Sequence, residues 1–453
     1  SLVSRLEAPW VRWYTGPTPF LMARSPSPDL EPELDRPDDE GAGSEAEAPS
    51  RVRSGPDPEI YPVSLDEETI DPDAAKVVRR LVRHGYEAYL VGGCVRDLLV
   101  GKRPKDFDVV TNARPDDVRR LFRNSRIIGR RFRLVHVLFG GGKVIETATF
   151  RKAPPESNGR DGEDLLIRND NVFGDAHEDA QRRDFTINAL FYDLEHGEIL
   201  DWVGGMPDIE RRSVHTIGKP VVRFLEDPVR LLRAIKFSAR LDFGIAPDVY
   251  DAIVCCRHAL RRAAKPRLFE EVLRLMRGGA AHRSLWIAWE TGVLDVLLPE
   301  LSTYLADRED DDDTVWRILS EVDRRTQGEG APLDDTVLWA ALLLEPLREA
   351  CHGERDRVEA AFHFLEPIVD RLNVPRRIAE PVRRVASMLP RLESGRVGRL
   401  SRSVHYSLAL EIASLRGASL SGPPPPDVTD ALPSEATRRR RRRRRRTRIE
   451  SGL

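Results

Sequence analysis

Apolar positions follow helix and strand periods in turn between residues 74 and 150. Residues 74–84 repeat at helical spacing, and the apolar run 88–91 ends at Gly92-Gly93. This pattern predicts a helix, a buried strand and a turn, with a second helix over 95–100. Further strands are predicted at 107–110, 126–128, 134–139 and 144–150, and Pro115 opens a helix after the first of them. Together they indicate a small domain built on a mixed sheet.

Beyond about residue 211 the strand pattern stops and helical spacing dominates. Helices are predicted at 228–240, 247–256, 267–276, 314–324 and 337–345. We therefore expect an α+β chain, with an α/β head at 70–210 followed by all-α segments at 211–275 and 276–420. The acidic, Pro-rich residues 1–60 and the Pro- and Arg-rich residues 421–453 are expected to be disordered, and 154–170 to form a mobile loop.

Composition indicates a globular protein. The 453 residues are 40% apolar and 32% charged. No apolar run of about 18 residues and no secretory signal pattern occurs, so we expect a cytoplasmic protein that does not use a membrane. The four cysteines are too few and too scattered for a disulfide framework or a zinc site, which favours reduced, packed thiols.

The first candidate for chemistry is Asp106-Phe107-Asp108, on the strand predicted at 107–110. Side chains at positions i and i+2 of a strand point to the same face, so the two carboxylates should converge. Like charges held this close need a cation, and hard oxygen ligands favour magnesium. A solvated acidic turn is the alternative interpretation.

Gly92-Gly93 is the second candidate. Glycines at a strand-to-helix turn let the backbone approach a ligand, and the amides at the helix start present positive charge to phosphate. Arg96 lies on the first turn of that helix. A simple tight turn is the alternative, but the position shortly before paired acids favours a triphosphate cradle.

Four blocks in this order resemble one enzyme family. They are Leu90-Val91-Gly92-Gly93-Cys94-Val95-Arg96-Asp97, Asp106-Phe107-Asp108, Gln181-Arg182-Arg183-Asp184-Phe185-Thr186-Ile187-Asn188-Ala189 and Glu226-Asp227-Pro228-Val229-Arg230-Leu231-Leu232-Arg233-Ala234. The pattern resembles the class II branch of the nucleotidyltransferase superfamily, which contains bacterial poly(A) polymerases and CCA-adding enzymes. The resemblance covers residues 70–420 and implies a nucleotidyltransferase head followed by a helical neck and body that bind nucleotide and RNA.

The resemblance implies roles for the matching residues. Asp106 and Asp108 would hold two magnesium ions, or manganese in their place, and activate an RNA 3′ hydroxyl for attack on the α-phosphate. Either Glu146 or Asp184 would complete the catalytic acids; the alternative for both is a structural salt bridge to Arg182 or Arg183. The implied ATP-binding residues are Gly92, Gly93, Arg96, Arg183, Asn188, Asp227, Arg230 and Arg233.

The start of the helix predicted at 228–240 combines an acid with two arginines that could bind a base. Asp227 can cap that helix, which carries Arg230 and Arg233 on one face. An aspartate beside arginines can imitate a base-pairing edge, and adenine and cytosine both fit it. A capping acid with surface arginines is the plainer interpretation. Lys236 stands where family members usually place an arginine, which puts a bidentate contact there in doubt.

Residues 129–137, 170–174 and 178–180 resemble the poly(A) polymerase branch, so we interpret the chain as an enzyme that adds AMP from ATP to RNA 3′ ends in RNA processing and decay. The alternatives are a CCA-adding enzyme and a non-catalytic RNA-binding protein with the same fold. The expected partners are ATP, RNA and RNA-decay proteins, with the chain itself a monomer. Arginines are the expected RNA contacts, with a charged strand edge and a solvated charge run as alternatives: Arg130, Arg131, Arg133, Arg438, Arg439, Arg440, Arg441 and Arg442.

Overall fold

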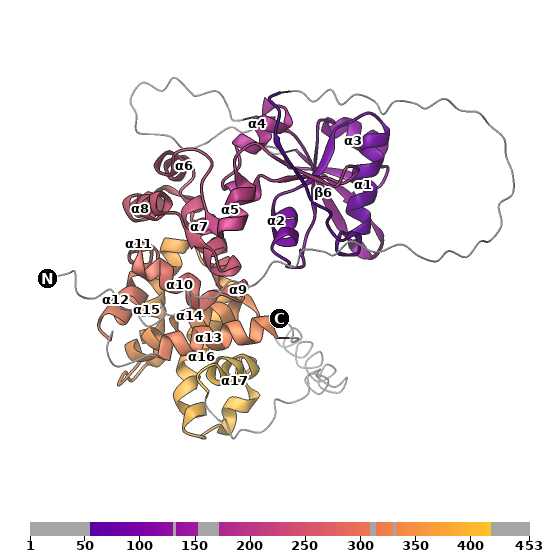
Figure 1. Cartoon of the computed structure of the whole chain (residues 1–453). Coiled ribbons are helices and arrows are strands. Elements are labelled where there is room, and N and C mark those ends of the chain that lie inside the picture. The colour runs from indigo at the N-terminus through magenta and orange to yellow at the C-terminus, as the bar shows by residue number, and fades with distance from the viewer. Residues whose placement is uncertain (1–54, 130–132, 153–171, 309–313, 329–331, 418–453) are drawn as a thin grey trace, which may run out of the picture. The chain divides into compact units, whose positions relative to one another are not determined.

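The computed structural model describes residues 55–129, 133–152, 172–308, 314–328 and 332–417. A mixed sheet with its helices comes first along the chain, and helices follow (Figure 1). This confirms the predicted α+β class. The predicted loop at 154–170 and the predicted tail from 421 lie outside the described residues, as does nearly all of the predicted N-terminal segment.

The main sheet has eight strands in the order β1-β10-β9-β2-β3-β6-β5-β4. Strands β3 and β6 run parallel, and the other neighbours in this sheet are antiparallel. The strands are β1 (Glu59–Pro62), β2 (Ala88–Val91), β3 (Asp108–Thr111), β4 (Ser125–Ile128), β5 (Leu134–Leu138), β6 (Val144–Thr149), β9 (Phe191–Asp193) and β10 (Glu198–Asp201).

Two details of the sheet differ from the predicted bounds. Strand β1 pairs with β10 and lies upstream of residue 70, so the sheet begins earlier than the predicted head. Strand β3 starts at Asp108, which leaves Asp106 just before the strand. The short length and mixed composition of residues 59–62 carried no clear strand period, and only pairing with β10 makes them a strand.

Alternating side chains divide the core into two layers. Ala88, Leu90 and Val109 pack on one face of the sheet, while Tyr89 and Val91 pack on the other. Helix α1 (Pro72–Arg83) contributes an apolar stripe to the first layer, and Asp71 caps it by accepting from the Asp73 and Ala74 amides. The other helices of the head are α2 (Gly93–Leu99), α3 (Pro115–Leu121), α4 (Ala176–Gln181) and α5 (Gly205–Arg211), with the 3-10 turns η2 (Glu67–Thr69), η3 (Gly140–Gly142) and η4 (Thr186–Asn188).

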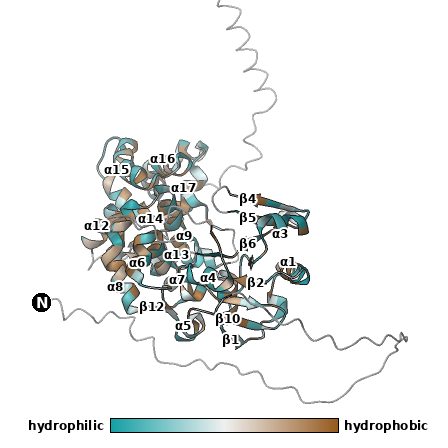
Figure 2. Ribbon diagram, turned by 90° about the horizontal axis from the view of Figure 1, so that it is seen from above, coloured by the Kyte–Doolittle hydropathy of each residue, from teal (hydrophilic) through white to brown (hydrophobic). Residues whose placement is uncertain are grey.

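The edge strand β4 ends in two hydrophobic residues, Ile127 and Ile128, and its ribbon is partly brown in Figure 2. Ile128 is 41% exposed at its end, whereas Ile127 packs against the core layer that includes α1. A short pair also forms outside the main sheet, from β7 (Arg151–Lys152) and β8 (Val172–Phe173). Because these strands have two residues each, the head is held mainly by the larger sheet.

The rest of the described chain is helical. One continuous core runs through it, with Trp339 and Tyr406 among its largest fully buried side chains. A two-residue pair, β11 (Ser213–Val214) with β12 (Gly244–Ile245), is the exception to the predicted end of strands. The helices are α6 (Pro220–Glu226), α7 (Val229–Leu241), α8 (Pro247–Cys256), η5 (Arg257–Arg262), α9 (Lys265–Arg277), α10 (Ala281–Glu290), α11 (Val293–Leu297), α12 (Pro299–Ala306), α13 (Thr314–Gln327), α14 (Asp335–Ala350), α15 (Arg357–Leu372), α16 (Arg376–Glu393), η6 (Gly398–Arg402) and α17 (Tyr406–Ser414).

All four cysteines are free thiols. Cys94, Cys256 and Cys351 are buried and Cys255 is exposed. The burial of three of the four confirms the prediction that the cysteines are mostly packed. Of the helices in the described ranges, none combines the length and apolar character that crossing a membrane requires.

Gly205 offers a test of the packing between α5 and η4. A Cβ atom added at Gly205 would lie 2.5 Å from the Thr186 carbonyl oxygen, a backbone atom that cannot rotate away. Gly205→Ala should therefore lower the free energy of unfolding by about 1–3 kcal/mol in urea titrations. Gly140→Ala is the matched control, because an added Cβ there meets open space, and it should change stability by less than about 0.5 kcal/mol.

Candidate active site

The paired acids lie where β3 meets its neighbours. Asp108 is the first residue of β3 and is the register partner of Val91 in β2 and of Glu146 in β6. Phe107 and Val109 are buried in the core while Asp106 and Asp108 are exposed, as strand alternation requires. Glu146 is also exposed and pairs with Asp108, and the charges of Glu146 and Asp106 both act on Asp108, so the three carboxylates lie close together.

Excess negative charge characterises this face. Desolvation of the Asp108 carboxyl by the protein around it, followed by the charges of Glu146 and Asp106, raises the pKa of Asp108 to about 6, against the opposing effect of Arg183. No described residue forms an ion pair with the Asp106 or Asp108 side chain. Glu146 lies beside a histidine: the His136 Nε2 atom is 3.4 Å from Glu146 Oε1. Among the described residues, no arginine or lysine therefore forms an ion pair with these three acids, and Arg183 opposes their charge without bonding to them.

The glycine corner, Gly92-Gly93, lies beside these acids. Gly92 has φ 79° and ψ −130°, a conformation that side chains disfavour, and it precedes α2. No side chain caps the start of α2 among the described residues. Since Val91 pairs directly with Asp108, the corner and the acids are brought together by strand pairing.

Arg183 bridges the glycine corner and Asp108. A Cβ added at Gly92 would lie 3.5 Å from Arg183 Nη1, and the Arg183 charge lowers the pKa of Asp108. Asp179 orients this arginine: its Oδ2 accepts from Arg183 Nη2 at 2.8 Å, and its Oδ1 lies 2.7 Å from Arg182 Nη2. Asp179 is fully buried, so the position of the Arg183 guanidinium is set by a carboxylate inside the fold.

A chain of polar side chains joins α2, η4 and α7; we call it the bridging network. Asn188 is its centre, accepting from Arg96 Nη1 at 2.5 Å and donating to Asp184 Oδ1 at 3.2 Å. The other Asp184 oxygen accepts from Arg233 Nε at 2.6 Å. The network consists of Asp97, Arg96, Asn188, Asp184, Arg233 and Arg240.

Arg240 closes the network at the far end of α7. Its Nη2 lies 2.9 Å from Asp97 Oδ2, and its carbonyl oxygen accepts from Lys102 Nζ at 2.6 Å. Arg96 donates to the other Asp97 oxygen from Nε at 2.9 Å and is only 2% exposed. Arg96, expected at a ligand, is thus bonded to protein groups inside the fold.

Asp184 belongs to this network rather than to the exposed acid cluster. Burial alone would raise the pKa of Asp184, but the Arg233 charge and the Asn188 amide outweigh it and hold the pKa at about 2. Of the two residues considered as the third acid, Glu146 lies opposite Asp108. Arg182 and Arg183, considered as salt-bridge partners for either acid, are instead held by Asp179.

The residues at the start of α7 have separate partners. The predicted cap differs in the structure: α7 begins at Val229 with Pro228 as its N-cap residue, and Asp227, one residue earlier, accepts from the Val229 amide through Oδ1 at 3.3 Å. Its other oxygen lies 2.9 Å from Arg267 Nη2. Arg230 is held by Glu226, with Nη1 2.8 Å from Oε2. Lys236 pairs with Glu271, and burial lowers the Lys236 pKa to about 8.

Of the arginines expected to contact RNA, Arg133 is described. Its side chain is 45% exposed, and its Nη2 lies 3.9 Å from Asp116 Oδ1. The remaining ones lie outside the described residues: Arg130, Arg131, Arg438, Arg439, Arg440, Arg441 and Arg442.

Comparison with known proteins agrees with this geometry. Residues 88–215 match the family described as "Poly A polymerase head domain", and residues 242–305 match "Probable RNA and SrmB- binding site of polymerase A". Poly(A) polymerase I of Salmonella typhimurium is 37% identical over 374 residues, which cover 78% of this chain and 80% of that protein. The chain belongs to the bacterial poly(A) polymerase family. Membership makes it a nucleotidyltransferase of the polynucleotide adenylyltransferase class.

CCA-adding enzymes are relatives in the same superfamily. The CCA-adding enzyme of Geobacillus thermodenitrificans is 38% identical over 233 residues, 51% of this chain and 54% of that protein. The crystal structure of the Bacillus stearothermophilus CCA-adding enzyme in complex with CTP aligns with TM-score 0.59 and 27% identity, over 78% of this chain and 80% of that one. The sequence similarity to the Salmonella enzyme therefore extends over more of the chain than the similarity to the Geobacillus enzyme.

The donor set of the candidate site fits a hard divalent cation. Asp106, Asp108 and Glu146 offer carboxylate oxygens, and the raised pKa of Asp108 reflects burial first and the charges of Glu146 and Asp106 second. Within the described ranges, no three side chains form a ready-made metal cage. Magnesium commonly binds through one or two carboxylates together with substrate phosphates, so such a cage is not required.

Sequence reasoning missed three residues that position the side chains of the candidate site. Asp179 precedes Arg182 and Arg183 by one helical turn, a spacing that could have marked it. Asp97 and Arg240 are far apart in sequence, and their contact depends on how α7 packs against the head. No local pattern indicates that pairing.

The Asp184–Arg233 pair makes a measurable contribution to stability. Arg233→Met should lower the free energy of unfolding at pH 7 by about 3 kcal/mol, because it leaves a buried carboxylate without its counterion. The pKa of Asp184 is about 2 in the folded protein, below the usual 3.8. The pair therefore stabilises the parent fully above about pH 4 and loses this effect as the pH falls toward 2.

Urea titrations of the parent and of Arg233→Met, from pH 7 downward, test this. The difference in the free energy of unfolding between the parent and Arg233→Met should decrease below about pH 4. The double variant Asp184→Asn, Arg233→Met is the control and should recover much of the loss, since it removes the uncompensated charge. If the single and the double variant lost the same free energy of unfolding relative to the parent, the ion-pair explanation would be contradicted.

Proposed function

We propose that this chain is a poly(A) polymerase that joins AMP from ATP to RNA 3′ ends without a template. The RNA 3′ hydroxyl oxygen forms a bond to the α-phosphorus as the bond from that phosphorus to the bridging oxygen breaks. Pyrophosphate leaves, and the hydroxyl proton passes to solvent or a nearby base. The product is RNA longer by one adenylate.

The observation that carries the proposal is the pairing of Val91 with Asp108. It brings the carboxylates of Asp106 and Asp108 next to the glycine corner. A triphosphate over this corner would lie close to backbone amides and to the Arg183 guanidinium. Positive groups on one side and acids on the other suit a phosphate chain bridged to the acids by cations.

Asp106 and Asp108 are the proposed holders of two magnesium ions, with manganese as a substitute. When bound, such ions activate the attacking hydroxyl and neutralise charge on the leaving pyrophosphate. Glu146, opposite Asp108 in β6, is the better-supported third acid. Asp184 is proposed to act by positioning Arg233 and Asn188, because its oxygens bond to both.

The base-reading role proposed for Asp227, Arg230 and Arg233 concerns the start of α7. Asp227 can accept from an exocyclic amine while an arginine donates to a ring nitrogen. In the described structure Asp227 bonds to Arg267 and Arg230 to Glu226, so binding a base would exchange these partners. Adenine and cytosine share the required edge, so the proposal for ATP alone depends on the longer similarity to poly(A) polymerase I.

Nucleotide selectivity tests the proposed reaction. Labelled ATP, CTP, GTP and UTP should each be offered to the purified protein, with an unstructured RNA and with a tRNA that lacks its CCA end. We expect long tails made of A alone on the unstructured RNA. Addition limited to two C and one A on the tRNA would overturn the poly(A) assignment in favour of CCA addition.

Asp108 tests the proposed chemistry separately from folding. Asp108→Asn should lower AMP incorporation by at least about a hundredfold, because an electrostatic contribution to the transition state is removed. The Asp108 pKa of about 6 exceeds the usual 3.8. In metal-free protein the ionised form therefore costs stability as pH rises from about 4 to 6, and the cost remains above 6.

Asp108→Asn should consequently unfold, without metal at pH 7.5, at a urea concentration equal to or above that of the parent. Asp251→Asn, at an exposed acid of α8, is the matched control and should retain activity. Full activity in Asp108→Asn would exclude the proposed mechanism. An inactive parent protein would instead favour the alternative of a non-catalytic RNA-binding protein.

A further inference from the structure

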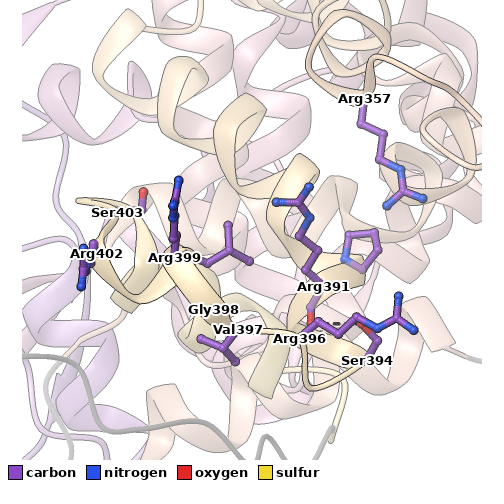
Figure 3. A pocket seen from close by; sticks show the side chains of 11 residues that line it. Arg357, Arg391, Ser394, Arg396, Val397, Gly398, Arg399, Arg402 and Ser403 are labelled. Carbon is purple, nitrogen blue, oxygen red and sulfur yellow. Dashed lines mark hydrogen bonds between the residues drawn. The ribbon is translucent and has the colours of Figure 1, made fainter.

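A pocket lined by arginines lies in the helical part, away from the residues of the active site. Its cavity volume is about 730 Å³, and its walls come from the start of α15, the end of α16, the turn that follows and η6 (Figure 3). The arginines around it are Arg357, Arg391, Arg396, Arg399 and Arg402. The described residues that line it include no acid.

These arginines are unpaired within the described part of the chain. None of the five guanidinium groups has an ion pair or a side-chain hydrogen bond with another described residue. The acid nearest to Arg391 and Arg396 in sequence, Glu393, is already engaged: its Oε1 lies 2.5 Å from Arg348 Nη1 and 3.3 Å from Arg416 Nη1. The described residues therefore leave the positive charge of the pocket uncompensated.

This differs from arginines elsewhere on the helices. Arg274, Arg324 and Arg384 are also exposed, and each lies within hydrogen-bonding distance of a glutamate on its own helix. Like charges gathered around one cavity repel and cost stability, and a cavity lined by one sign of charge concentrates oppositely charged ligands. The pocket thus favours an anion.

The arrangement suits several phosphates rather than one. Figure 3 shows the arginines spread along the end of α16, the turn and η6, with Arg357 on the opposite wall. Arginine recognises phosphate through paired N–H donors, and contacts of this kind position a nucleic acid without reading its sequence. Pro390, Val397 and Leu400 add apolar surface to the lining, which a ribose or base can cover.

We propose that this arginine pocket binds the sugar–phosphate backbone of the RNA substrate upstream of its 3′ end. The inference rests on the proposed function, since it names where the substrate of that reaction is held. None of the residues that line the pocket belongs to the sheet, the glycine corner or α7. The pocket therefore contributes to the affinity for long RNA and leaves the chemical step unchanged.

The test is the triple variant Arg396→Gln, Arg399→Gln, Arg402→Gln in the full chain. Affinity for a long unstructured RNA should fall at least about tenfold at 0.1 M salt, and the slope of log K against log salt should flatten by up to about 0.7 for each RNA phosphate that the variant no longer binds. KM for long RNA should rise, while kcat should stay within about twofold. A primer of about four nucleotides, too short to engage a second site, should be extended equally by the parent and the variant.

The matched control is Arg274→Gln, Arg324→Gln, Arg384→Gln, which changes the net charge equally at paired arginines. Its affinity for the long RNA should fall much less than that of the pocket variant. Equal losses would mean that general charge, not the pocket, is responsible, and unchanged binding in the pocket variant would also overturn the inference.

Two further outcomes identify the source of the phosphate and separate this inference from the proposed function. If free pyrophosphate raises the melting temperature of the parent more than that of the pocket variant while RNA affinity is the same in both, the ligand is a small phosphate and the RNA proposal fails. Absence of AMP addition to the short primer by the parent protein would instead show that the proposed function itself is wrong.

Discussion

Two ion pairs on α7 support the arrangement of the site. Arg233 bonds to Asp184 and Arg240 bonds to Asp97, so both ends of one face of the helix are attached to the head. Both carboxylates are largely screened from water and depend on these arginines. Through Arg96 and Asn188 the same network reaches α2, which begins at the glycine corner.

The acids on the sheet face differ from Asp97 and Asp184, because they are not paired with arginines. Strand register places Glu146 opposite Asp108, and no arginine or lysine among the described residues forms an ion pair with Asp106, Asp108 or Glu146. Burial and the two neighbouring acids raise the pKa of Asp108, although the charge of Arg183 opposes the shift. The fold thus contains one set of carboxylates that is paired with arginines of the chain and another that forms no arginine or lysine ion pair among the described residues. That contrast, rather than the number of acids, distinguishes positioning residues from the proposed catalytic ones.

The helical part shows the same contrast in its arginines. Arg274, Arg324 and Arg384 each pair with a nearby acid, whereas the arginines around the pocket at the end of α16 have no such partner among the described residues. Uncompensated acids in the head and uncompensated arginines in the body are what an enzyme needs if metal-bound phosphates react at one place and an RNA backbone is held at another.

The sequence alone determined the elements with a strong local period: five strands of the main sheet, β2 to β6, and the helices α1, α2, α3, α7, α8, α9, α13 and α14. Short strands such as β1, β9 and β10 carried no clear period and formed only through pairing in the sheet. The sequence also indicated that Asp106 and Asp108 share a face and that Gly92-Gly93 forms a turn, since strand alternation and a following turn need no distant contact. Tertiary structure decided the rest. Whether Glu146 or Asp184 faces Asp108 depends on strand order, and the contact of Asp97 with Arg240 depends on how α7 packs. Both contacts join residues that are far apart along the chain, and a local sequence period cannot predict which distant residues meet.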